Sequence, residues 1–443
     1  MTAEVAIINS NAVAIAADSA VTIGRGKKIY NSAIKVFALS KIAPVGIMVY
    51  GNASLLGVPW ETIIKIYRSE LKYVTYQTLE DYARSFLDFL KHQNRFFPPE
   101  LQSSWIEANI QGYFELIRET LFEKVQKELK EKGKLSEEKI SEFLKESVAE
   151  HHDHLKKISF VEKMTEDDEK KLQSLYGAKI KNIVSKIFQN IKLDRGSLIK
   201  LHQIASFLHT REIFSDSTSG VVISGFGEVD IYPVVSTHEI EGVFCEKLKY
   251  KYREDKSYRI KSGADCSIIP FAQDDMVASF MEGTNPSVSR FIVQYLEQLF
   301  SRLPELVTDE ILIGEKKDKE NARRKIREDA SKLLEGFFKQ LQFHKQIEHI
   351  GPILSMVQVL PKDELAAMAE SLVNLTAFKR RMTDVLETVG GPIDVAVISK
   401  GDGLVWVKRK LYFPKELNQH FFANYFKGFD GLTHMKGEGD EYE

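Results

Sequence analysis

The first eighteen residues, MTAEVAIINSNAVAIAAD (residues 1–18), decide the fold. Small and β-branched residues fill two arms, Ala3 to Ile8 and Ala12 to Ala17, and the polar tripeptide Asn9-Ser10-Asn11 separates them. A short polar turn between two apolar arms is typical of a tight β-hairpin. We therefore predict two paired strands that begin directly after residue 2.

Thr2 gives this hairpin its chemical interest. Its small side chain permits removal of Met1, which would leave a threonine carrying a nucleophile and a base on one residue. The hydroxyl could attack a carbonyl, and the free α-amine, with a reference pKa of about 7.7 to 8.0, could accept the proton near neutral pH. Because threonine is common at position 2, the interpretation depends on the residues that follow it.

Two charged residues follow the nucleophile candidate in the predicted elements. Asp18 ends the second arm, and Lys35 lies among apolar neighbours in a strand-like stretch from Ser32 to Phe37, beyond a turn near Gly24 to Gly26. A lone lysine in an apolar strand usually lies at an edge and extends to water, and an aspartate commonly caps a turn. Each residue alone therefore has a structural explanation, and only their order along the chain with Thr2 indicates a catalytic site.

A strand, a glycine and a helix are expected next along the chain. The apolar run Ile42 to Tyr50 predicts a strand that stops at Gly51, and Ala53 to Tyr73 has helical spacing with Asn52 as a suitable N-cap. A backbone N–H at a helix N-terminus suits a developing negative oxygen.

The ordered set of Thr2, Asp18, Lys35 and Gly51 resembles the proteasome β-subunit branch of the N-terminal nucleophile hydrolases. The resemblance implies that the Thr2 hydroxyl is the nucleophile and that the Lys35 ammonium lowers the cost of forming the alkoxide. It further implies that Asp18 holds Lys35 and that the Gly51 N–H donates to the oxyanion. These roles suit the residues, because a positive charge beside a hydroxyl favours its anion.

The same resemblance implies substrate-binding positions at Thr22 and Ala53, where the backbone would pair with an extended substrate. The spacing from Asp18 to Lys35 is one residue longer than the family's usual pattern, which a loop near Gly24 to Gly26 could absorb.

The resemblance resumes near the far end of the chain. Leu360 to Phe378 predicts the family's last helix, and the glycine pair Gly390-Gly391 leads into a strand that ends at Ile398. The motif Gly-Gly-Pro-Ile-Asp, residues 390–394, is closer to the bacterial proteasome-related family called Anbu than to the proteasome itself. Leu404 to Lys408 would close a hairpin with that strand. In the central part of the chain, further strands are expected at Gly220 to Val235 and at Glu241 to Leu248. Ile268 to Gly283 would then lead into a helix.

Two departures from the family pattern lie around the expected site. Phe271-Ala272-Gln273-Asp274 stands where the proteasome has Gly-Ser-Gly-Ser. Leu386 and Val389 stand where the family has an aspartate and a serine; Asp384, Glu387 or Thr388 could substitute. Because supporting residues orient the reacting ones, reduced, retuned or absent activity stays open.

Large helical insertions interrupt the expected core. Helix breaks are predicted at Pro98-Pro99, Gly133 and Gly177, with Ser136 and Thr165 as N-caps. Mixed charges at helical spacing usually mark solvated faces; the alternative is a lid, a gate or a partner-docking surface. We divide the chain into an N-terminal core part with the nucleophile (2–76), a helical insertion (77–215), central core strands and a helix (216–307), a charged helical insertion (308–350), the C-terminal core helix and strands (351–412), and an aromatic then acidic extension (413–443).

Composition agrees with an enzyme-sized globular protein. The 443 residues are 43% hydrophobic and carry a formal net charge of −2, which gives no general attraction to nucleic acid or anionic membrane. Cys245 and Cys266 form no disulfide framework, which predicts a reducing cytoplasm. The N-terminus lacks the basic segment of a secretory signal, and no apolar run reaches the length of a membrane-spanning helix.

Other motifs are weaker. His151 and His154 share a helix face and suggest a metal site, but no second ligand pair has a recognisable spacing, so a solvated histidine-rich helix is the preferred interpretation. Gly225-Phe226-Gly227 lacks the third glycine of a dinucleotide fingerprint. We expect no cofactor and no metal.

The sequence thus predicts an α+β protein with the four-layer αββα sandwich that the resemblance implies. The expected function is an N-terminal threonine hydrolase of amide bonds, a self-compartmentalising peptidase that assembles into a homo-oligomer and acts on peptide or protein substrates. Two alternatives stay open: a catalytically silent scaffold that binds a protein partner through its helical insertions, and a small-molecule amidase.

Overall fold

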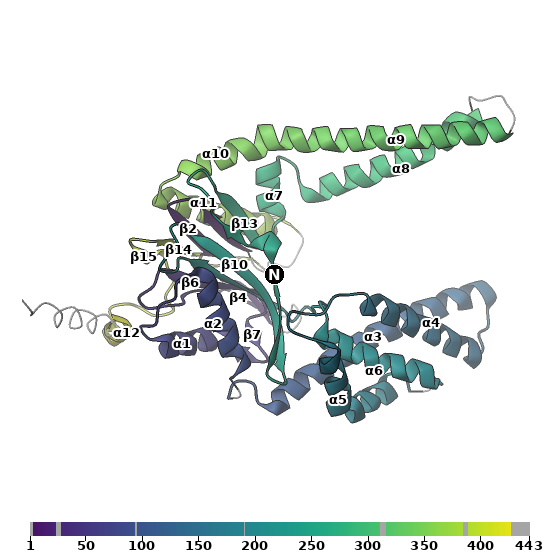
Figure 1. The fold of residues 1–443 in the computed structure, drawn as a ribbon, viewed down its shortest axis with the longest axis horizontal. Coiled ribbons are helices and arrows are strands. Elements are labelled where there is room, and N and C mark those ends of the chain that lie inside the picture. Colours follow the sequence, from purple (N-terminus) through teal and green to yellow (C-terminus); the bar gives the residue numbers. More distant parts are fainter. Residues whose placement is uncertain are drawn as a thin grey trace, which may run out of the picture. The chain divides into compact units, whose positions relative to one another are not determined.

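The computed structural model describes residues 3–23, 28–93, 95–189, 191–310, 316–383 and 389–426, and these mix helices with antiparallel sheets in an α+β fold (Figure 1). The chain forms two compact units. The first comprises Met1–Val36, Ile231–Val234 and Tyr258–Glu443, and the second comprises Phe37–Asp230 and Val235–Ser257.

A five-stranded antiparallel sheet in the order β13-β1-β2-β14-β15 forms the centre of the first unit. The predicted hairpin is confirmed at the predicted residues, as β1 (Ala3–Ile8) and β2 (Ala12–Ala17). In its turn, the Asn9 side-chain oxygen accepts hydrogen bonds from the backbone N–H groups of Asn11 and Ala12, at 3.0 and 3.3 Å. The other strands are β13 (Ser267–Ala272), β14 (Asp394–Ser399) and β15 (Gly403–Lys408).

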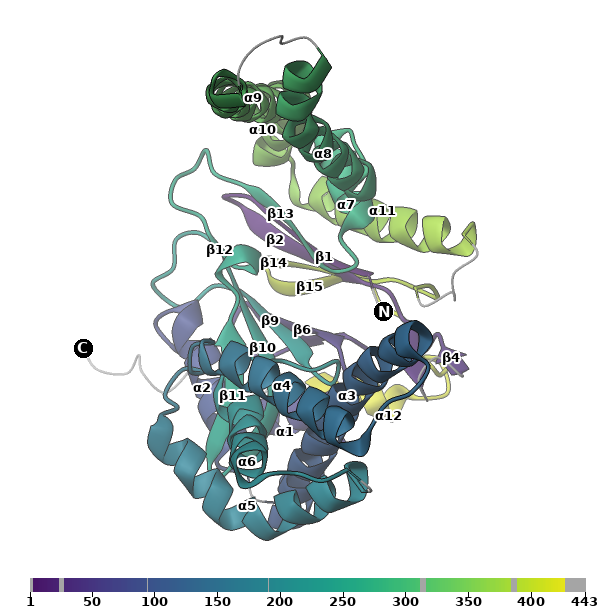
Figure 2. The same cartoon turned by 90° about the vertical axis from the view of Figure 1, so that its right-hand side faces the viewer.

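Helix α11 (Lys362–Arg381) lies along one face of this sheet, as both views show (Figures 1 and 2). The alanines of β2 keep that face shallow, so that Leu365 and Ala369 of the helix can pack against Val5 and Ala14 in a buried core. The predicted last helix and C-terminal hairpin are therefore confirmed.

The remaining elements of the first unit are mostly helical. Helices α8 (Pro286–Glu310) and α9 (Lys316–Lys345) pack against each other as a long hairpin, which begins 22 residues before the predicted insertion at 308. The others are β3 (Val21–Ile23), β4 (Lys28–Tyr30), β12 (Tyr258–Arg259), α7 (Asp275–Glu282), the π-helical turn η2 (Gln346–Ile350), α10 (Gly351–Val359) and α12 (Gln419–Phe426).

A second antiparallel sheet, in the order β11-β10-β9-β6-β5, forms the centre of the second unit. Helix α2 packs on β9 and β11, and its Phe86 meets Tyr67 of α1 edge to face at 5.0 Å between ring centres. The elements are β5 (Val36–Ala38), β6 (Val45–Gly51), α1 (Trp60–Leu71), α2 (Leu79–Lys91), β9 (Ser219–Gly225), β10 (Val234–Phe244), β11 (Lys247–Tyr252) and the short 3-10 turn η1 (Glu254–Lys256).

Four helices of the second unit build a core of their own. They are α3 (Pro99–Lys132), α4 (Glu137–Lys156), α5 (Glu166–Ile187) and α6 (Arg195–Thr210). Ser136 and Thr165 are N-caps as predicted, and Gly133 ends α3 with a φ of +73°. The predicted break at Gly177 is wrong, because this glycine lies inside α5, where a β-carbon would meet nothing within 4 Å.

Two other boundaries differ from prediction. The helix expected from Ala53 begins only at Trp60, because a small hairpin of β7 (Ser54–Leu55) and β8 (Val58–Pro59) comes first. Its turn uses Gly57 at a φ of +85°, a conformation that glycine adopts without strain. The single strand expected from Glu241 to Leu248 is instead the end of β10, which stops at Phe244, and the start of β11 at Lys247.

Each unit thus has one large sheet with helices packed on it, and the four-layer sandwich stays a prediction. None of the helices in the described part of the chain combines the length and the hydropathy of a membrane-spanning segment.

Candidate active site

Asp18 is the centre of a buried polar cluster at the end of β2. The side chain is fully buried, and its Oδ1 accepts hydrogen bonds from the Ala3 N–H, at 3.2 Å, and from the Lys35 ammonium. Its Oδ2 accepts from the N–H groups of Ala20, at 3.2 Å, and Gly390, at 2.9 Å. Four donors therefore fix the carboxylate in one orientation, and two of them come from the first strand and the glycine pair that the sequence singled out.

Lys35 lies between two carboxylates. Besides its bond to Asp18, its Nζ lies 3.2 Å from Oε1 of Glu4, and the lysine is only 7% exposed. The interpretation as an edge lysine that extends to water is therefore wrong. The expected strand from Ser32 is also wrong, because β5 begins at Val36, one residue beyond the lysine.

Glu4 was missed by sequence reasoning, although it is the one charged residue among the apolar residues of the first arm. It lies in β1 opposite Ala17, the residue before Asp18. On the other edge of β2, Asp394 of the neighbouring strand β14 also lies opposite Ala17. Because directly opposed residues project to the same face of a sheet, Glu4 and Asp394 share a face.

That face is the one away from α11. Residues Ala3, Val5 and Ala16 alternate with Glu4 and Ala17, and they belong to the core that contacts α11. Since side chains alternate along a strand, the acidic side chains of β1 and β14 point to the opposite side.

A second lysine, Lys410, joins this end of the sheet. Its backbone N–H and its Nζ bond to the two carboxylate oxygens of Asp394, at 2.8 and 2.9 Å. The Nζ also donates to the Ser19 hydroxyl, which in turn donates to the Pro392 carbonyl. Burial lowers the pKa of the Lys410 ammonium, and the nearby positive charge of Lys35 acts in the same direction, while Asp394 opposes both.

The site thus gathers three carboxylates, of Glu4, Asp18 and Asp394, and two ammonium groups, of Lys35 and Lys410. No local pattern marks Lys410, because it follows the last strand and reaches Ser19 from 391 positions away. The arrangement fixes the Lys35 side chain through Asp18, the same carboxylate that binds the Ala3 N–H.

The remaining predicted site residues are placed as follows. Thr2 lies outside the described residues; its neighbour Ala3 is bonded to Asp18. Thr22 pairs with Ile29 between β3 and β4. Ala53 is exposed, and its carbonyl accepts a hydrogen bond from the Trp60 N–H at 3.1 Å.

Gly51 ends β6 in the second unit, with a φ of +78°. A β-carbon there would come within 2.7 Å of the Thr218 carbonyl oxygen, so the position requires glycine for two reasons. The expected place of Gly51 at a helix N-terminus is wrong, because α1 starts at Trp60 with Pro59 as its N-cap. Of the four expected catalytic residues, the structure brings Asp18 and Lys35 into contact.

The two departures from the family pattern are placed only in part. Ala272 has a φ of +53°, and the Gln273 side-chain oxygen accepts from Arg380 Nε at 2.7 Å, which ties this segment to α11. Val389 is buried in the core under α11. Asp384, Leu386, Glu387 and Thr388, like the turn at Gly24 to Gly26, lie outside the described residues.

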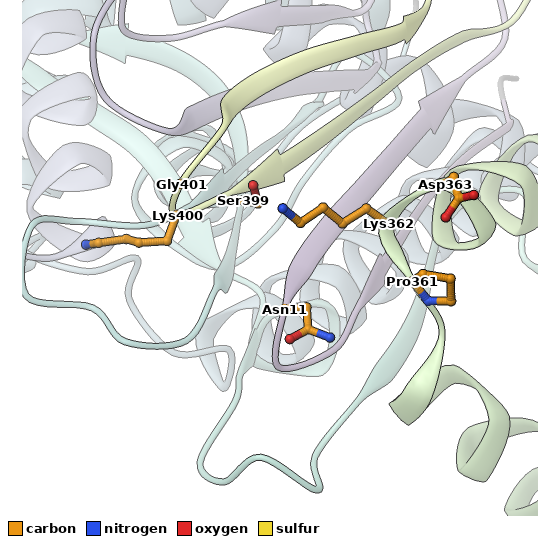
Figure 3. A pocket seen from close by; sticks show the side chains of 7 residues that line it. All are labelled: Asn11, Pro361, Lys362, Asp363, Ser399, Lys400 and Gly401. Atoms are coloured by element: carbon orange, nitrogen blue, oxygen red, sulfur yellow. The ribbon is translucent and has the colours of Figure 1, made fainter.

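A surface hollow at the opposite end of the hairpin is a poorer candidate (Figure 3). Asn11 of the turn, Lys362 at the start of α11 and Lys400 of the β14–β15 turn line it. Six residues of extended strand, or about 20 Å, separate this turn from Asp18. The Lys362 ammonium is already paired with Asp402 at 2.5 Å.

Two histidines of α4, His151 and His152, have protein partners, and His154 is exposed. His151 Nδ1 lies 2.9 Å from the Tyr113 hydroxyl, and His152 lies between Asp153, at 2.8 Å, and Gln203, at 2.9 Å. Across the described ranges, the histidine, cysteine and carboxylate side chains form no group of three that could hold a metal ion.

Comparisons with known proteins give limited information. No protein-family model matches the chain, and no curated protein matches it. Among solved structures, it is similar to an Anbu (Gly-1) mutant from Hyphomicrobium sp. strain MC1, with 8% identity, a TM-score of 0.33 and all of both chains covered. It is also similar to Anbu (ancestral beta-subunit) from Yersinia bercovieri, with 10% identity, a TM-score of 0.27, and 100% of this chain and 99% of that chain covered. Because both TM-scores are below 0.5, the proposal of a function rests on the geometry of the site and not on these similarities.

Proposed function

We propose that this protein is an N-terminal threonine hydrolase that cleaves amide bonds in peptides. After Met1 is removed, the Thr2 hydroxyl attacks the substrate carbonyl, and the Thr2 α-amine takes the hydroxyl proton. The tetrahedral intermediate collapses to an acyl-enzyme as the amine leaves with that proton. A water molecule, deprotonated by the same α-amine, then releases the acid and restores the threonine.

One observation carries the proposal. Oδ1 of Asp18 accepts hydrogen bonds both from the Ala3 N–H and from the Lys35 ammonium. The Ala3 nitrogen is covalently bonded to the carbonyl carbon of Thr2, so one buried carboxylate oxygen anchors both the lysine and the chain next to the nucleophile. A cation held in this way lowers the free energy of a nearby alkoxide.

The other residues take supporting roles in this proposal. Lys35 stabilises the alkoxide, Asp18 orients Lys35, and the Gly51 N–H stabilises the oxyanion. Thr22 and Ala53 pair with an extended peptide through their backbones. The four-layer sandwich would form when the two sheets face each other, and the protein would enclose its sites by assembling with copies of itself in a reducing compartment.

A second candidate function is a catalytically silent scaffold, and a specific observation favours it. Glu4 places a second carboxylate 3.2 Å from Lys35, which offsets the positive charge that an alkoxide would use. Lys35 would then serve to balance buried charges, and the helical insertions would bind a partner.

Intact-mass measurement separates the two functions. The purified protein is incubated with an epoxyketone probe, which needs both a hydroxyl and a free α-amine on one residue. The hydrolase predicts a mass without Met1 and a single adduct that disappears in Thr2→Ala. Retained Met1 with no adduct would support the scaffold. If the adduct forms, unlabelled protein is then assayed on peptide libraries and on small amides, which distinguishes a peptidase from a small-molecule amidase.

A further inference from the structure

The α8–α9 hairpin exposes a long apolar face that no described residue of its own unit covers. Six side chains of this face are named the hairpin patch: Phe291, Tyr295 and Leu299 on α8, and Leu333, Phe337 and Phe343 on α9. Their exposure ranges from 44% for Leu299 and Phe337 to 68% for Phe343. Large apolar side chains exposed together are typical of an interaction surface.

The hairpin has a fixed alignment along its length. At its base, Lys345 Nζ contacts Ser289 at 3.3 Å and forms an ion pair with Glu282 of α7 at 2.8 Å. Toward its far end, Arg323 Nε donates to the Thr308 hydroxyl at 2.8 Å. These contacts between the two helices define which residues of α8 and α9 lie at the same position along the hairpin axis, which is called the same height below.

The patch residues match in height across the two helices. Phe291 is two residues after Ser289, and Phe343 is two residues before Lys345. Leu299 is nine residues before Thr308, and Leu333 is ten residues after Arg323. Two stripes therefore run side by side from the base toward the middle of the hairpin.

The stripes also lie on one side of the hairpin. Successive residues of a helix are rotated by about 100° around its axis. On each helix, the patch residues are rotated from the residues that pack between α8 and α9 by roughly a third of a turn on average, and the direction of rotation, viewed along the chain, is the same on both helices. Because the helices are antiparallel, equal rotations in this sense bring the two stripes to the same side. The result is a continuous apolar face two helices wide.

We propose that a second copy of this chain covers the hairpin patch, so that two hairpins form a four-helix bundle. Bundles of this kind bury apolar stripes that a single hairpin leaves exposed. The six side chains offer roughly 600 Å² of exposed apolar surface per copy. Two copies would bury about 1,200 Å², which reaches the range of specific protein interfaces.

Charge also favours a second copy over an unrelated partner. Arg302 lies six residues before Thr308, and Asp329 lies six residues after Arg323, so the two opposite charges lie at the same height beyond the apolar stripes. A two-fold interface brings each surface against an identical one. Two copies can therefore pair these charges reciprocally. This pairing of copies does not depend on the proposed chemistry at Thr2.

The test measures the mass of the full chain in solution by light scattering over a wide concentration range. We expect a reversible assembly of an even number of the 50.6 kDa chains. The double variant Phe291→Glu with Phe343→Glu should weaken the assembly by about 100-fold or more and halve its mass. The control Gln294→Glu with Gln342→Glu adds equal charge on exposed residues of the other side and should leave the assembly intact.

Cross-linking keeps the test decisive if the charged variant folds poorly. Leu299→Cys should give an inter-copy cross-link with a short bis-maleimide, and Gln294→Cys should give only the background of the native Cys245 and Cys266. A monomer at every concentration, an assembly that survives the patch variant, or equal cross-linking at both positions would each overturn the proposal.

Discussion

Each unit of the molecule buries a lysine against a carboxylate, and the two pairs differ in what surrounds them. Lys249 in the second unit is 1% exposed and donates to Glu241 and to the carbonyls of Leu208, at 2.6 Å, and Ile213. Glu241 also accepts from the Ser215 N–H at 2.9 Å. All three ammonium protons thus have partners, and the pair fastens the end of α6 to β10 and β11.

The Lys35 pair of the first unit has a different environment. Among the described residues, Lys35 donates to Asp18 and forms an ion pair with Glu4 at 3.2 Å. Thr2 directly precedes Ala3, the residue that Asp18 anchors. A buried lysine–carboxylate pair is therefore not by itself a functional site. A closed set of partners, as at Lys249, indicates a structural pair. The Lys35 pair differs because Asp18 also accepts from the Ala3 N–H, next in the chain to the proposed nucleophile Thr2.

The largest expected effect is on stability at the closed pair. Lys249→Met should lower the free energy of unfolding by about 3–5 kcal/mol, because Glu241 would remain buried without its cation. Denaturant titration measures this loss. Adding Glu241→Leu should recover most of it, since replacing both charges removes the uncompensated one. If both variants lost equal stability, the pair would not be the fastening between helix and sheet.

The matching change in the first unit should act on the rate. Under the proposed chemistry, Lys35→Met should reduce epoxyketone labelling of the folded protein by about 10²–10³-fold, as loss of a charge-stabilising donor commonly does. Lys249→Met serves as the control, because it loses stability while its folded fraction should label at the wild-type rate. Equal labelling by the two variants would remove Lys35 from the chemistry.

Glu4 should have a smaller effect that shows in the pH profile. Its carboxylate lies 3.2 Å from Lys35 Nζ, and under the proposed chemistry its negative charge should favour the protonated α-amine of Thr2. Glu4→Gln should therefore move the acidic limb of kcat/KM for a peptide substrate to lower pH, by about one unit or less. Glu4→Asp keeps the charge and should retain the wild-type limb. An unmoved limb in Glu4→Gln would leave Glu4 with a structural role alone.

The sequence predicted the local parts of this comparison and missed the long-range ones. The β1–β2 hairpin followed from neighbouring residues, an apolar arm, a polar turn and a second apolar arm, so its bounds were right. The helix expected from Ala53 was wrong because helical spacing outweighed Gly57, whose positive φ turns the chain back first. The spacing of apolar residues does not indicate where such a turn lies.

Within the site, the family pattern named Asp18 and Lys35, and the structure places them in contact. Glu4 had a local signal, a charge inside an apolar arm. Asp394 and Lys410 had none, because their meeting with Ser19 depends on β14 pairing with β2 across most of the chain. The partners of Lys249 were equally hidden, since two of them are backbone carbonyls.

The smallest expected effect concerns Lys410 and alkaline pH. Burial lowers the pKa of its ammonium from the ordinary value of about 10.4. Between the lowered pKa and 10.4, the unfolded chain binds more protons at this group than the folded chain does, so this group makes stability rise with pH in that window. Below the window the folded protein bears the cost of a buried charge.

Arginine at this position isolates the effect, because its guanidinium stays charged throughout. Lys410→Arg should keep the contact with Asp394 near neutral pH and lack the alkaline gain, so the difference in unfolding free energy between wild type and variant should grow as the pH rises. Urea titrations at several alkaline pH values measure it. A constant difference would mean that Lys410 keeps its proton in the folded state, and that Asp394 outweighs burial and Lys35 in setting the charge of this end of the sheet.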